Sequence, residues 1–147
     1  MTNGGYAAYN QSIAQTNEKK GRVLLRLYEG AVKFVRFARI GIKKNSPKVR
    51  GENISKVMAI LTELDCALDR GMEGELVGNL ADLYRYMMGR LAIANTGNDT
   101  VALDEVERLL LELKEAFERA YEAESLISPA QPEGEEPAVM GEVRVAV

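Results

Sequence analysis

The chain has 147 residues, of which 46% are hydrophobic and 28% are charged, and its formal net charge is −3; these values are typical of one soluble domain. It contains no histidine and one cysteine, which excludes histidine-based catalysis, most zinc sites and an internal disulfide. No apolar run approaches the roughly 20 residues that cross a bilayer. No apolar run of the kind found in a cleaved signal peptide follows Met1. We therefore expect a soluble protein that is not exported by a cleaved signal and has no stable membrane insertion, and an enzyme is the less favoured class.

The charge is distributed unevenly along the chain. Residues 19–56 carry twelve lysines and arginines against Glu29 and Glu52, whereas residues 122–147 carry six glutamates against Arg144. Such asymmetry is typical of nucleic-acid contact, of partner docking or of ordinary solvated helix faces.

The first 16 residues are small and polar, apart from three large apolar side chains. Tyr6, Tyr9 and Ile13 share one helical face by their spacing. Gly4 and Gly5 argue against regular structure, and so short a segment does not form a stable helix alone. We therefore expect a mobile N-terminal lid over residues 1–16.

The lid has a predicted docking place. Burying its apolar side chains roughly balances the entropy of ordering about ten residues, so we expect a displaceable contact in a groove between helices. The predicted groove residues are Met58, Leu61, Leu76 and Leu80.

Beyond the lid, apolar residues recur with a helical period in four stretches, residues 17–45, 47–68, 76–94 and 103–121. The breaks carry turn residues, with Ser46 and Pro47 typical of a helix start and a second turn signal at residues 96–99. These stretches predict an all-α fold, an antiparallel four-helix bundle over residues 17–124.

Individual positions can be assigned from the same stripes. Tyr84 and Leu91 lie on the main stripe of the third stretch and are expected in the core. Gly30 is expected to permit close approach of two helices. Cys66 neighbours the second stripe, and a buried, unreactive thiol is expected there.

Residues 125–147 change in character. Three of the four prolines of the chain lie here with two glycines and four glutamates. This composition predicts a disordered acidic tail.

Some apolar residues lie off the main stripes and are candidates for an exposed surface that binds a partner helix. They are Val23, Leu25, Val77, Met88, Leu109 and Leu111. The basic residues 19–56 offer an alternative, a basic-faced helical adaptor that binds RNA or an acidic regulatory protein. Because Tyr28 and Phe34 lie on the core stripe, away from the basic side chains, nucleic-acid binding is the less favoured interpretation.

Three blocks of this sequence resemble flagellar secretion chaperones of the FliS type. They are LLRLYEGAVKF at residues 24–34, EGELVGNLADLYRYMMGRLAIAN at 73–95, and ND followed by LDEVERLLLELKEAFERA within 98–120. The middle block is the most specific, since a generic bundle would not reproduce its N-L-x-x-LY-x-YM-x-x-RL pattern. Asn17 stands where the family usually has proline, and the acidic tail is not a family hallmark.

The resemblance implies a cytoplasmic chaperone that is an antiparallel helical bundle. Such chaperones bind the disordered C-terminal segment of flagellin, prevent its premature polymerisation and deliver it to the flagellar export gate, without cofactor or hydrolysis. The resemblance does not decide whether the chain forms a homodimer. In the family the N-terminal segment lies over a bundle groove and is displaced by cargo. The matching positions here are Tyr6, Tyr9, Asn10 and Ile13.

Overall fold

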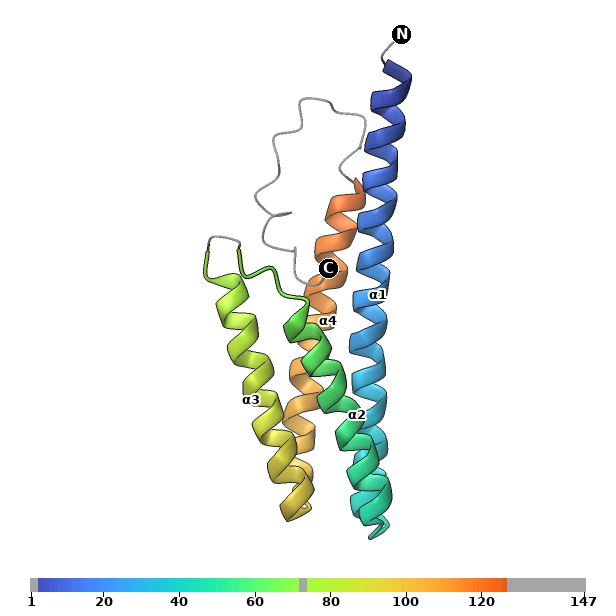
Figure 1. Cartoon of the computed structure of the whole chain (residues 1–147). Coiled ribbons are helices and arrows are strands. Elements are labelled where there is room, and N and C mark those ends of the chain that lie inside the picture. The colour runs from blue at the N-terminus through green and yellow to red at the C-terminus, as the bar shows by residue number, and fades with distance from the viewer. Residues whose placement is uncertain (1–2, 72–73, 127–147) are drawn as a thin grey trace.

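The computed structural model describes residues 3–71 and 74–126 and contains four α-helices there, α1 Asn3–Lys43, α2 Pro47–Cys66, α3 Leu76–Gly97 and α4 Thr100–Leu126. Successive helices run in opposite directions (Figure 1). The predicted all-α antiparallel bundle is confirmed. The predicted tail over 125–147 lies outside the described residues, except that α4 continues through Ser125 to Leu126.

The helices form a square in which sequence neighbours are also spatial neighbours. α1 packs on α2 and α4, and α3 packs on the same two helices. α1 and α3 therefore occupy opposite corners (Figure 1), as in an up-down-up-down bundle with short loops.

The core consists of the apolar stripe of each helix, and the structure finds no buried charged residue in the described part of the chain. Tyr28 on α1 and Tyr84 on α3 extend into the core from opposite corners of the bundle. Their hydroxyl oxygens are 2.6 Å apart and share a hydrogen bond. The ring of Phe117 on α4 stacks on Tyr28 at a centroid distance of 5.7 Å. Tyr84 and Leu91 are fully buried, which confirms their assignment to the core.

The predicted turns lie where the sequence placed them. Ser46 caps α2, its Oγ accepting a hydrogen bond from the Val49 amide at 3.3 Å, and Pro47 opens the helix. Asn98 ends α3 in the left-handed conformation with φ of 50°. Asp99 then accepts hydrogen bonds from the amides of Val101 and Ala102. These caps satisfy several of the orphan backbone groups at the helix ends locally, which suits short loops.

The close approach of α1 and α2 occurs at Gly41 and not at Gly30. A Cβ at Gly41 would lie 2.5 Å from the backbone nitrogen of Arg50, whereas one at Gly30 would make ordinary contact with Ile60 at 3.6 Å. The difference follows from the position of Gly41 beside the α1–α2 turn, where the two backbones have not yet diverged.

The N-terminal segment differs from the prediction of a separate lid. Residues 3–16 are helical and form the first turns of α1 (Figure 1). An isolated segment of this length would have to nucleate a helix, but a segment joined to an existing helix only has to extend it. No proline interrupts residues 3–43, so extension through Asn17 meets no barrier.

Candidate partner-binding surface

The predicted lid residues project beyond the bundle. Tyr9 is 64% exposed on the N-terminal turns of α1, and these turns extend past the ends of the other three helices (Figure 1). The side chains of Tyr6, Asn10 and Ile13 lie outside the described part of the structure. In this conformation residues 3–16 continue α1 and do not fold back on the bundle.

The four predicted groove residues do not form one groove. Leu61 and Leu80 belong to the core, and Met58 is partly buried against it. Leu76, at the start of α3, is 37% exposed. Of these four residues only Leu76 presents a substantial apolar surface to a partner.

A row of apolar side chains runs along the side of α3 that borders α4. The hydroxyl of Tyr86 donates to Glu105 Oε1 at 2.7 Å, and Arg90 Nε lies 2.8 Å from the same oxygen, which places this side of α3 next to α4. Val101, one turn before Glu105 and 68% exposed, continues the row onto α4. Leu83 is partly buried, and the other members are exposed. We name this row the α3–α4 strip; it consists of Leu76, Leu83, Tyr86, Ile93 and Val101.

A second exposed surface lies on the side of α1 that faces away from the bundle. Consecutive members of this surface are three, four or seven positions apart in the sequence, so they share one helical face. All are exposed, and Phe37 and Ile40 are the two apolar members among basic side chains. We name it the outer row of α1; it consists of Lys19, Arg22, Arg26, Lys33, Phe37 and Ile40 on the helix and Lys44 in the turn directly after it.

Charged side chains join α1 to α4 between these surfaces. Arg39 contacts Asp104 at 2.9 Å and Glu107 at 2.6 Å, and Arg36 lies 3.4 Å from Glu107. Partial burial acts to raise the pKa of Glu107, but the hydrogen bond and charge of Arg39 outweigh it and the pKa is lowered. Glu107 is therefore ionised at neutral pH and forms an ion pair across the contact of α1 with α4.

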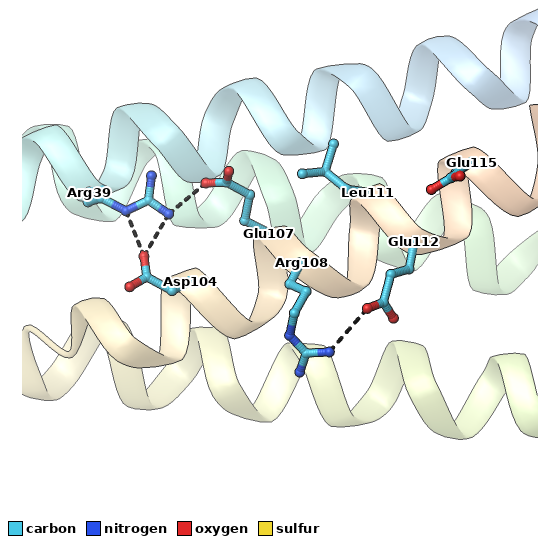
Figure 2. A pocket seen from close by; sticks show the side chains of 7 residues that line it. All are labelled: Arg39, Asp104, Glu107, Arg108, Leu111, Glu112 and Glu115. Carbon is cyan, nitrogen blue, oxygen red and sulfur yellow. Dashed lines mark hydrogen bonds and ion pairs between the residues drawn. The ribbon is translucent and has the colours of Figure 1, made fainter.

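An open depression of about 490 Å³ lies beside this pairing. Figure 2 shows Arg39 reaching from α1 toward Asp104 and Glu107, while Arg108 pairs with Glu112 along α4. Leu111 is the single apolar residue of the lining, and the other six are charged. This composition does not suit an apolar partner helix.

Within the described ranges, no three His, Cys, Asp or Glu side chains gather in a way that could hold a metal ion. Cys66, expected to be buried, is exposed. It lies two residues after the buried Leu64, and two residues turn a helix by about 200°, away from the core.

No helix within residues 3–71 and 74–126 is long and apolar enough to cross a membrane.

Sequence reasoning missed most of the α3–α4 strip. Of the six off-stripe residues, Val23 and Leu111 are exposed, Val77 is buried, and the other three are partly buried. Tyr86 and Ile93 stand two positions after the core residues Tyr84 and Leu91, so a helical projection centred on the core stripe would have placed them on the opposite face.

The fold and this surface define a class of protein, an all-α bundle whose exposed features are apolar and charged helix faces. The model of the family described as "Flagellar protein FliS" matches residues 1–124, and the chain belongs to this family.

Three curated relatives illustrate the membership. The chain is 35% identical over 119 residues to "Flagellar secretion chaperone FliS" of Bacillus subtilis (strain 168), covering 81% of this chain and 87% of that protein. It is 41% identical over 97 residues to "Flagellar secretion chaperone FliSB" of Pseudomonas aeruginosa, covering 66% and 77%. It is 33% identical over 115 residues to "Flagellar secretion chaperone FliS" of Salmonella typhimurium, covering 78% and 85%.

Proposed function

We propose that this chain is a cytoplasmic chaperone that binds the C-terminal segment of flagellin, prevents its premature polymerisation and delivers it to the flagellar export gate. Family membership supports the chaperone class, since the relatives are named flagellar secretion chaperones. A protein of this kind needs an exposed surface for a polypeptide and no reactive centre.

The observation that carries the proposal is the α3–α4 strip. Its apolar side chains lie along one side of α3 and continue onto α4, where a partner helix could cover several of them at once. Burying an exposed isoleucine or valine fully contributes about 1.5–3 kcal/mol. Several such contacts offset the entropy that a disordered segment loses when it folds on binding.

Leu76 in the strip and Tyr9 on the N-terminal turns are exposed and remain proposed contacts. Tyr6, Asn10 and Ile13 also remain proposed contacts, and their side chains lie outside the described part of the structure. Leu61 and Leu80 are buried in the core, so contact with them would first require the bundle to open.

Calorimetry with a peptide from the flagellin C-terminus tests the proposal. We expect one-to-one binding with a negative heat-capacity change, because apolar area is buried. Ile93→Asp should weaken binding at least about tenfold, equivalent to 1.4 kcal/mol. Val23→Asp is the matched control, since Val23 on α1 and Ile93 are both 47% exposed. An absence of binding, or an equal loss in both variants, would contradict the proposal.

Tyr9 can be tested separately, because it lies outside the bundle. Tyr9→Ser should leave the denaturation midpoint unchanged and weaken peptide binding. Unchanged affinity would remove Tyr9 from the proposed surface and leave the strip unaffected.

A further inference from the structure

The outer row of α1 carries five basic side chains that have no ion pair within residues 3–71 and 74–126. By contrast, the basic side chains of α1 on the α4 side, Arg36 and Arg39, are paired with carboxylates. From Lys19 to Ile40 the row extends over about 32 Å of helix at 1.5 Å per residue. An unpaired positive row of this length, with Phe37 and Ile40 exposed within it, suits an extended acidic segment that also carries apolar side chains.

The chain itself contains a segment of this chemistry. Residues 127–147 contain four glutamates and one basic residue, Arg144. The first three glutamates are followed by the apolar residues Val139 and Met140. The family model ends at residue 124, so the fold of the family does not account for this segment.

α4, to which the segment is joined, ends near the level of the first residues of the row, on the side of α1 that packs on α4. α4 ends at Leu126, and its last turns lie against the N-terminal half of α1 (Figure 1). The contact there is tight, since a Cβ at Gly21 would lie 2.8 Å from the ring of Tyr121. Arg22 and Lys19 are one and two residues along the sequence from Gly21.

Along the segment acidic residues precede apolar ones, and along the row basic residues precede apolar ones, so the two sequences of residue types are complementary in the same order. From Gly21, the basic residues continue to Lys33, about 18 Å away, before Phe37 at about 24 Å. Fully extended, the chain from Leu126 reaches about 23 Å at Glu133 and about 43 Å at Val139. Acidic residues can therefore reach the basic part of the row, and Val139 can reach Phe37 and Ile40.

We propose that residues 127–147 dock along the outer row of α1, with the glutamates against Arg22, Arg26 and Lys33 and with Val139 and Met140 against Phe37 and Ile40. The tether makes the contact intramolecular, with an effective concentration in the millimolar range, so weak individual contacts suffice. The docked segment leaves the α3–α4 strip uncovered, so the contact is independent of the proposed flagellin binding.

Paramagnetic NMR on the full chain tests the proposal. A nitroxide is attached at Val139→Cys in a Cys66→Ser background, and amide intensities are compared before and after its reduction. We expect amides near Phe37 and Ile40 to lose about half of their intensity or more, since at a millimolar effective concentration a contact with a millimolar Kd is half populated. The loss should decrease in Arg22→Gln/Arg26→Gln/Lys33→Gln and should persist in the matched control Arg108→Gln/Arg119→Gln on α4.

Three results would overturn the proposal. The first is a loss of intensity centred on α3 or α4, or no localised loss. The second is an equal loss when nitroxide-labelled chains without isotope are mixed with unlabelled ¹⁵N chains, which would indicate contact with a second copy. The third is an absence of localised loss while a single-stranded RNA oligonucleotide shifts the same amides, which would assign the row to an external polyanion.

Discussion

The hydrogen bond between Tyr28 and Tyr84 should make two single substitutions more harmful than their combination. Both side chains are fully buried, and their hydroxyls are 2.6 Å apart. Tyr28→Phe leaves the Tyr84 hydroxyl buried without this partner, and Tyr84→Phe leaves the Tyr28 hydroxyl in the same position. Each substitution should lower the free energy of unfolding by about 1–3 kcal/mol. The double variant replaces both polar groups by apolar ones of the same shape, a change that is close to neutral.

The assay is urea denaturation followed by far-UV circular dichroism, with the four proteins forming a double-mutant cycle. Tyr86→Phe is the control, because its hydroxyl bonds Glu105 at the exposed surface, and it should change stability by no more than about 0.5 kcal/mol. If the double variant loses the sum of the two single losses, the hydroxyls act independently and the argument is wrong.

Three further predictions concern the same bundle. Leu91→Ala should lower the free energy of unfolding by about 2–5 kcal/mol, because it removes a fully buried side chain; a wild-type melting curve would contradict the core assignment. Gly41→Ala should destabilise by about 1–3 kcal/mol through collision with the α2 backbone, whereas Gly89→Ala, with nothing within 4 Å, should gain about 0.5–1 kcal/mol. Burial raises the pKa of Tyr84 to about 12 and that of Tyr28 higher still, from an ordinary 10.0, so the unfolded chain releases these protons first. Stability should therefore decrease above pH 10, with a slope of up to about 1.4 kcal/mol per pH unit for each group, and the Tyr28→Phe/Tyr84→Phe variant should flatten that slope.

Local features were well predicted from the sequence, because their causes are local. The cap at Ser46 and the turn that ends at Asp99 depend on side chains that bond backbone groups two or three residues away. The apolar period identified the core stripes, including Leu91. The family blocks at 24–34, 73–95 and 98–120 led to the family that the comparison shows, which favours the chaperone over the basic-faced adaptor.

The candidate site was predicted less well. Leu61 and Leu80 are apolar residues on the core stripes, and no pattern in one helix indicates whether a neighbouring helix covers them. The expectation that residues 1–16 lack regular structure was wrong for a related reason. The argument treated residues 1–16 as a separate peptide, whereas their conformation depends on the helix to which they are joined.

The sequence by itself determined four amphipathic helices, their order and their breaks, because periodicity and capping depend on neighbours within a few residues. Only the tertiary structure decided which apolar side chains remain exposed, as at Tyr86 and Ile93, and which pairs meet across the core, as at Tyr28 and Tyr84. The physical reason is that a helical period gives the direction of a side chain around its own axis. Burial and contact depend in addition on where the other helix axes lie.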